Sequence, residues 1–390
     1  AYYQFGAYQL QLELLRSLFP DGEDKPPKVS TKRSQSWTAN GLANSYAASG
    51  QSANAVRLFL VSAELDESDG DKENLAISLG NVARQQLAIG ALSAAERNLR
   101  RKIDLCREIA DEYWEASGHH ELVRVLSYCG KWQDAEQQQD QALSLVKKLS
   151  EIQPEGTIWL YSALRFLLMA REETIFDTRK SNNEYQILAL RNVEASAIES
   201  AQRALELADK NGLGYPVPRD YVRAYWLLGA AYCANNELTL AEENLSKALN
   251  LCRQINAVDA EADILLDLAR LSFAYALRAE RSGVLSLSKD RSPSAPQKST
   301  GTSQDRLQYF QDAQEKASEA LMITERSGYV LQGADVNLFL AQYALEQEKD
   351  KAKAKQYAET ALKLAHCDDG PPYYYKVAYE EAERFLEKLK

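Results

Sequence analysis

Several residue types and patterns are scarce in this 390-residue chain, and each scarcity excludes a class of protein. Proline occurs 10 times and glycine 18 times, which is too few for a loop-rich β-protein or a disordered chain. The best apolar stretch, residues 160–170, contains Arg165 and is shorter than the roughly 18 residues a membrane-spanning helix needs. A formal net charge of −10 leaves no basic excess, so we expect neither nucleic acid nor a membrane as a partner.

Cysteine pairs and a secretory signal are also missing. The chain begins with aromatic, uncharged residues, unlike the basic and then apolar start of a signal peptide. The five cysteines are odd in number and form no CxxC pair, which predicts free thiols in the reducing cytoplasm. They are Cys106, Cys129, Cys233, Cys252 and Cys367.

Motifs that carry chemistry are absent from the sequence. It contains no G-x-x-x-x-G-K-[ST], G-x-S-x-G or H-E-x-x-H pattern. His119 and His120 are adjacent, so on a helix they point in different directions and cannot chelate a metal together. A metal shared with Cys129 is the alternative to ordinary packing. We therefore expect no cofactor, no metal and no enzymatic activity; turnover that depends on His119 or His120 would revive an enzyme hypothesis.

An internal repeat dominates what the sequence does contain. Alanines recur after a turn at the start of a helix, and four of their six spacings lie between 40 and 44 residues. The two longer spacings contain insertions, residues 177–184 and 282–305. A 146-residue offset aligns Ala95-Glu96 with Ala241-Glu242 and Leu105-Cys106-Arg107 with Leu251-Cys252-Arg253, which marks a repeat protein. The repeating alanines are Ala55, Ala95, Ala135, Ala197, Ala241, Ala313 and Ala354.

The repeat pattern predicts pairs of helices. Small residues let two helix backbones approach closely, and turns are expected at Gly50, Gly90, Gly130 and Asn236. No segment alternates with a period of two, so we predict no strands. The expected fold is all-α, a right-handed α-solenoid of helix-turn-helix repeats with units of about 40 residues.

These units resemble the tetratricopeptide repeat (TPR) family, and the resemblance covers nearly the whole chain. The matching residues of one unit are Leu42, Ala43, Tyr46, Gly50 and Phe59, in addition to its repeating alanine. The units are longer than the family's roughly 34 residues and lack its helix-ending proline. HEAT and armadillo repeats share the period but do not account for the small-residue positions.

The last third of the chain resembles one subfamily in particular. Residues 262–270, 325–342 and 367–379 are similar to the C-terminal repeats of bacterial STAND proteins, the signal-transduction ATPases with numerous domains. In that family the repeats are a sensor that follows an effector and an NTPase. The resemblance implies a sensor domain that is controlled by a protein or peptide, together with an NTPase module upstream in the full-length protein.

The expected organisation has five parts. Residues 1–27 are expected to end a preceding repeat whose earlier part has been removed, and residues 28–281 form the first repeats. Residues 282–305 are rich in Ser, Lys, Pro and Gly and are expected to be a disordered insertion, with or without a linear motif. Residues 306–370 continue the repeats, and residues 371–390 form a capping helix.

The candidate binding site is the concave face, which the first helix of each pair lines. Asn, Arg and His at its inward positions are suited to hydrogen bonds with a peptide backbone or a carboxylate, and a Trp is suited to anchor an apolar side chain. Asn44 and Asn81 match the asparagines of the TPR carboxylate clamp, but the clamp lysines are missing, and a generic hydrated groove is the alternative. The candidate residues are Asn40, Asn44, Asn81, Arg84, His120, Arg124, Arg223 and Trp226.

Two functional hypotheses follow. The first is a non-catalytic sensor domain of a bacterial STAND-type signalling or defence ATPase, which binds a protein or peptide ligand. The second is a stand-alone TPR scaffold or adaptor that binds a partner peptide.

Overall fold

The computed structural model describes residues 8–175, 184–214, 216–287 and 303–390. Within these ranges every long element is a helix and no strand occurs, so the prediction of an all-α TPR-like solenoid is confirmed. The helices are α2 (Tyr8–Arg16), α3 (Lys32–Ala48), α4 (Ser52–Asp69), α5 (Lys72–Ala88), α6 (Leu92–Glu108), α7 (Glu112–Tyr128), α8 (Trp132–Leu149), α9 (Ile152–Ile175), α10 (Glu184–Gly212), α11 (Pro218–Ala234), α12 (Leu238–Gln254), α13 (Val258–Leu287), α14 (Ser303–Ser327), α15 (Val330–Tyr343), the short π-helix η2 (Ala344–Glu348), α16 (Lys351–Ala365) and α17 (Lys376–Leu389).

Turns that recur every 20 residues set the helix lengths in the N-terminal half. Residues with left-handed backbone conformation occur every 20 positions, with φ between 55° and 80°. A left-handed residue ends an α-helix and lets the chain reverse, so each helix from α3 to α8 ends one or two residues before one of them. As a result α3, α5, α7 and α9 begin 40 residues apart. The left-handed positions are Gly50, Gly70, Gly90, Ala110, Gly130 and Ser150.

The repeating alanines occupy equivalent places in the core. One lies in each even-numbered helix from α4 to α16, and all seven are 0% exposed. The small residue on the preceding helix has the predicted role. A Cβ added to Gly229 on α11 would lie 2.6 Å from the Leu245 side chain on α12. Helix pairs therefore pack backbone to backbone at these positions, as the repeat pattern predicted.

Two helix pairs are longer than the others, which changes the expected boundaries. Helices α9 and α10 have 24 and 29 residues, and α13 and α14 have 30 and 25, against 17 or 18 in most helices. Much of the extra sequence therefore lengthens helical hairpins. Residues 282–287 and 303–305, which we assigned to a disordered insertion, are helical, whereas residues 288–302 and 177–183 lie outside the described residues.

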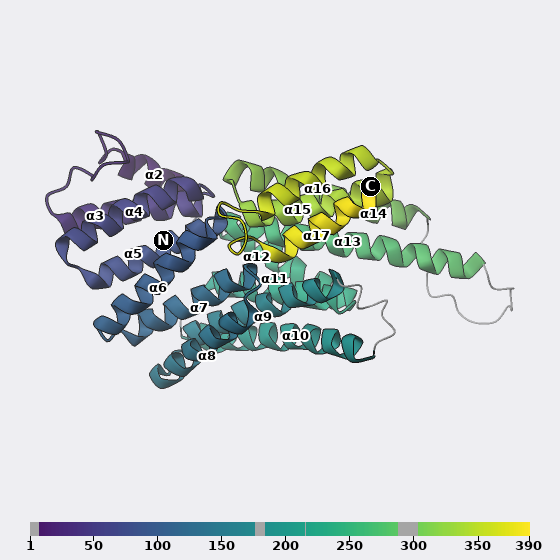
Figure 1. Ribbon diagram of the computed structural model, residues 1–390, viewed down its shortest axis with the longest axis horizontal. Coiled ribbons are helices and arrows are strands. Elements are labelled where there is room, and N and C mark those ends of the chain that lie inside the picture. The colour runs from purple at the N-terminus through teal and green to yellow at the C-terminus, as the bar shows by residue number, and fades with distance from the viewer. Residues whose placement is uncertain (1–7, 176–183, 215, 288–302) are drawn as a thin grey trace.

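The odd-numbered helices form an inner layer and the even-numbered helices an outer one. Each odd helix from α3 to α15 packs on the even helix that follows it, and from α5 onward successive odd helices contact one another. Helix α17 also contacts α9, so α9, α11, α13, α15 and α17 form a closed circle of inner helices (Figure 1). The predicted capping helix therefore does more than cover the last repeat, because it packs back onto the middle of the chain.

The N-terminal repeats also contact the C-terminal half. The turn at Gly90 lies against Val330 at the start of α15, and the Asp368 N–H donates to the Gly90 carbonyl at 3.4 Å. At Gly50 an added Cβ would meet Ser327 and Val258. The turns at Gly50 and Gly90 are thus buried by residues far along the chain. No helix among the described residues is long and apolar enough to cross a membrane.

Candidate functional site

The inner helices place an unusual number of charged side chains on one surface, which we call the inner face. It consists of polar, charged and aromatic side chains of the odd helices α5 to α15. Burial varies over this surface: the side chains of Arg219 and Asp259 are 35% and 37% exposed, whereas that of Asp267 is 11% exposed. The inner face is formed by Arg84, His120, Glu121, Arg124, Tyr161, Arg171, Arg219, Arg223, Trp226, Asp259, Asp263, Asp267, Arg270, Gln332 and Asp335.

At one end of the inner face, an ion pair joins α5 to α7. The Arg84 guanidinium donates to Glu121 Oε1 from Nη2 at 3.0 Å and from Nε at 3.2 Å, and the Tyr161 hydroxyl donates to the same oxygen at 3.2 Å. The Glu121 side chain is only 5% exposed, whereas that of Arg84 is 39% exposed. Burial alone would raise the pKa of Glu121, but the guanidinium of Arg84 and other nearby cations hold it well below its ordinary value.

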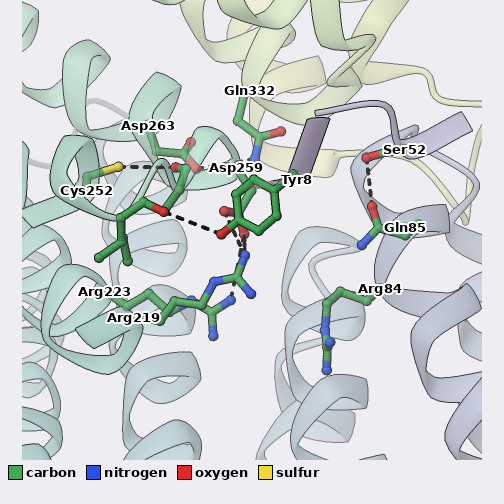
Figure 2. Close-up of polar contacts among 12 residues, drawn as sticks. Tyr8, Ser52, Arg84, Gln85, Arg219, Arg223, Cys252, Asp259, Asp263 and Gln332 are labelled. Atoms are coloured by element: carbon green, nitrogen blue, oxygen red, sulfur yellow. Dashed lines mark hydrogen bonds and ion pairs between the residues drawn. The ribbon is translucent and has the colours of Figure 1, made fainter. Parts of the chain in front are cut away.

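A second arginine group lies on the opposite wall. Arg219 Nη2 donates to both oxygens of Asp259, at 3.0 and 2.9 Å, and Arg223 lies 3.9 Å from the same carboxylate. Although burial acts to raise it, these two arginines lower the pKa of Asp259 to about 2. Figure 2 shows Arg84 on one wall facing Arg219 and Arg223 on the other, with Tyr8 of α2 beside the second group.

Arg124, on the inner surface of α7, lacks an acidic partner among the described residues. Its guanidinium lies over the Tyr161 ring, 5.6 Å from guanidinium carbon to ring centroid, and its charge acts on the nearby carboxyls of Glu121 and Asp263. The neighbouring His120 ring also lies against Tyr161, at 5.8 Å between centroids, and its buried Nδ1 has no hydrogen-bond partner in the described part of the chain. Burial lowers the pKa of His120 to about 3, so this imidazole is neutral at physiological pH.

Helix α13 presents three aspartates to the inner face at intervals of four residues, Asp259, Asp263 and Asp267. Residues four apart share one side of a helix, which explains why all three converge there. Asp267 accepts from the Trp226 indole N–H at 2.7 Å and from Arg270 at 2.9 Å. Asp263 accepts a hydrogen bond from Gln332 Nε2 at 3.3 Å and forms no ion pair with a described residue.

The structure brings together some of the predicted site residues and separates others. Arg84, His120, Arg124, Arg223 and Trp226 all contribute to the inner face. The Trp226 ring is packed between two core clusters and its N–H is already bound to Asp267, which favours a structural role.

The three predicted asparagines lie toward the N-terminal end. Asn40 and Asn44 are on α3, where Asn44 donates to the Asn40 side chain at 2.6 Å, so they interact with each other. Asn81 is half-buried on α5, three residues before Arg84. Their binding roles remain a prediction.

The two adjacent histidines point in different directions, as predicted. His119 is 2% exposed and its Nδ1 lies 2.7 Å from Gln138 Oε1 on α8, whereas His120 faces Tyr161 on α9. Among the residues that the structure describes, no group of three His, Cys, Asp or Glu side chains is arranged to hold a metal ion.

The repeat register did not identify the acidic side chains of the inner face or its residues on α15. The sequence does contain a pattern that points to them, because Asp263, Asp267 and Arg270 interrupt one of the most apolar helices at positions that share a face. Charged residues on an otherwise buried helix surface require partners, and these partners come from other repeats. Register within one repeat does not identify them.

Searches against protein-family models and against curated protein sequences find no match to this chain. Solved structures do match. A Rap protein complexed with competence and sporulation factor superposes with a TM-score of 0.51 at 11% identity, over 93% of this chain and 85% of that one. Human IFIT1 with m7Gppp-AAAA superposes with a TM-score of 0.32 at 12% identity, over 97% of this chain and 85% of that one.

A third matching structure is a STAND protein with a tetratricopeptide repeat sensor from Pyrococcus horikoshii. It gives a TM-score of 0.28 at 16% identity, over 86% of this chain and 53% of that chain. Of these three, the likeness to Rap alone exceeds a TM-score of 0.5, and at this identity it shows a shared fold. The chain therefore has the fold of a TPR-like helical repeat protein.

Proposed function

We propose that this chain is a non-catalytic peptide-binding module and that an extended segment of its partner lies along the inner face. One observation carries the proposal: the inner face holds buried polar atoms that have no partner within the described part of the chain. His120 Nδ1 and Gln332 Oε1 are two such atoms, and the half-buried Arg124 guanidinium beside them forms no ion pair with a described residue. Buried polar groups without partners are costly, so their presence favours a bound ligand that supplies them.

An extended peptide has the right chemistry for this surface. Each of its residues carries one N–H donor and one C=O acceptor, which matches the mixture of acceptors and donors on the inner face. The Rap structure, which shares this fold, is a complex with competence and sporulation factor, and this supports a ligand-binding role for this chain. Because the inner helices form a closed circle, the ligand is expected to be short or unfolded.

Selection from a random-sequence heptapeptide library displayed on phage tests this function. Enriched peptides are then titrated against the wild-type protein, Arg124→Ala and Arg97→Ala. Arg97 is exposed on the outer helix α6, so its truncation is a matched control. We expect a loss of at least tenfold in affinity for Arg124→Ala and none for Arg97→Ala. Failure to enrich any peptide, or equal affinity of all three proteins, contradicts the proposal.

The finer hypothesis places this module in a larger signalling protein. The similarity of residues 262–270, 325–342 and 367–379 to STAND sensor repeats favours a bacterial, cytoplasmic signal-transduction role, in which ligand binding shifts an NTPase between two states. A stand-alone adaptor is equally compatible with the fold. The gene sequence before Ala1 separates the two, because a sensor requires an upstream Walker motif and an adaptor does not.

A further inference from the structure

The aspartates of α13 and α15 on the inner face differ in one respect, which is whether a cation neutralises them. Asp259 binds Arg219, and Asp267 binds Arg270. Asp335 on α15 binds Arg171 at 2.8 Å. Asp263 lies between the first two on α13, and among the described residues it is the member of this set without a cationic partner.

The side chain beside Asp263, that of Gln332, also lacks a hydrogen-bond partner for one of its atoms. Gln332 on α15 is 7% exposed, and its amide is held at Asp263 by the 3.3 Å hydrogen bond from Nε2. The Oε1 atom of that amide is buried and has no hydrogen-bond partner among the described residues. When Asp263 is ionised, the pair therefore presents a carboxylate and an amide oxygen, two acceptors, without a donor that is shared between them. Figure 2 shows the two side chains extending toward each other from separate helices.

We propose that Asp263 and Gln332 form a subsite for a cationic nitrogen group of the ligand, either a guanidinium or an ammonium. Such a group carries several N–H donors and one positive charge, so it satisfies the amide oxygen and neutralises the carboxylate together. This inference rests on the proposed function, since it names the chemistry of one position of the bound peptide. In a peptide the group is a basic side chain or the free N-terminus.

The electrostatic setting supports a cation at this position. Burial and the neighbouring carboxylates of Asp267 and Asp335 raise the pKa of Asp263 to about 8, despite the hydrogen bond from Gln332 and the nearby charge of Arg124. Without a ligand the carboxyl therefore keeps its proton near neutral pH. A bound cation stabilises the ionised form, so binding is expected to release a proton.

Arg124 is the competing explanation, because it is a nearby cation with no carboxylate of its own among the described residues. If Arg124 neutralised Asp263 by a side-chain rotation, the subsite would already be filled. The two possibilities differ in the wild-type protein. If Arg124 fills the subsite, an external cation binds only after Arg124 is replaced. If the subsite is open, the cation binds the wild type, binds more tightly when the Arg124 charge is removed, and binds more weakly when the Asp263 charge is removed.

Small probes test the subsite directly. The folded wild-type chain is titrated with n-butylguanidinium, n-butylammonium and n-butylurea, the last of which has nearly the shape of the guanidinium but no charge. We expect one or both cations to bind and n-butylurea to bind at least tenfold more weakly. Asp263→Asn should reduce cation affinity at least tenfold, and Arg124→Met should increase it. Asp69→Asn, on the exposed end of α4, is the matched control and should have no effect.

The outcomes separate this inference from the function it rests on. Equal binding of n-butylurea, or no effect of Asp263→Asn, overturns the subsite even when library peptides bind. Cation binding that depends on Asp263, with no peptide enriched, supports the subsite and contradicts the peptide-binding function. Comparing acetyl-Gly-Arg-Gly-amide with Gly-Gly-Gly-amide then tells whether a side chain or the N-terminus supplies the cation. Thermal melting of each variant confirms that it is folded.

Discussion

Arg171 on α9 and Glu381 on α17 are 210 residues apart in the sequence, yet their side chains form two hydrogen bonds, Nη2 to Oε2 at 2.6 Å and Nε to Oε1 at 3.3 Å. The same guanidinium donates to Asp335 Oδ1 on α15 and to the Tyr375 hydroxyl, both at 2.8 Å. One side chain therefore connects three segments of the inner circle. The acidic partners raise the pKa of Arg171 well above its ordinary value, even though burial opposes this.

Replacing Arg171 by methionine should open the circle. The change leaves Asp335 and Glu381 without their shared cation, and breaking a largely buried ion pair in this way costs about 3 kcal/mol. We expect that loss in the free energy of urea unfolding, together with faster amide hydrogen exchange in α17. Arg100→Met is the control, because Arg100 is 52% exposed and pairs with Glu96 on the same helix, a contact worth about 0.5 kcal/mol. Equal losses in the two variants would show that Arg171 has no special role.

Contact between the N-terminal turns and the C-terminal half can be tested at two glycines. Gly90 and Gly70 have similar φ values, 80° and 73°, so alanine at either position costs about 1 kcal/mol of backbone strain. At Gly90 the new Cβ would also lie 2.8 Å from the Val330 side chain, whereas at Gly70 nothing lies within 4 Å. Gly90→Ala should therefore be less stable than Gly70→Ala by about 1 to 3 kcal/mol. Identical melting temperatures would argue against this contact in solution.

Lys102 should give the protein an unusual alkaline stability profile. This lysine is 2% exposed, donates to Ser117 Oγ at 3.0 Å and lies over Trp114. Burial, with repulsion from Arg84, lowers its pKa from 10.5 to about 8. Between those pH values the unfolded chain binds more protons than the folded one, so stability rises with pH. Lys102→Met should raise stability at pH 7 by about 1 kcal/mol and abolish the rise, as measured by melting between pH 7 and 10.5.

Asp263 should make the folding stability fall with rising pH, which is opposite to the effect of Lys102 and occurs at lower pH. Its pKa is about 8 in the folded protein, where Asp267, Asp335 and Arg124 surround it, against an ordinary value of 3.8 in the unfolded chain. The folded state therefore holds the extra proton between these values, and its stability falls as pH rises. Asp263→Asn removes this proton uptake, so it should match the wild type near pH 4 and exceed it by about 1 to 3 kcal/mol at pH 8. Parallel stability curves from urea unfolding would contradict the assigned burial of this carboxyl.

The repeat could be predicted because its physical basis is local. The alanines in each outer helix and Gly229 are small for one reason, the close approach of the two helices of a pair, and that requirement recurs in every unit. Turn positions such as Gly50 and Asn236 could be predicted as well, since a residue in the left-handed conformation follows the helix at each of them.

The candidate site was predicted only in part, because the residues that pair with the predicted ones come from other repeats. The basic residues Arg84 and Arg124 were found from helix register alone. Their significance depends on what faces them, and Glu121 lies one repeat away from Arg84. Asp263 was missed because an aspartate on an apolar helix has no evident role until α15 brings Gln332 beside it.

The sequence alone determined the helix-turn-helix unit, its period and its order along the chain, because neighbouring helices of one pair contact each other through residues close in sequence. Tertiary structure alone decided that the row of units closes through Arg171 and Glu381, and which of the described inner charges remain without a partner. Closure depends on the small rotation between successive units, summed over many of them. No single repeat encodes that sum in a pattern that can be read from its residues.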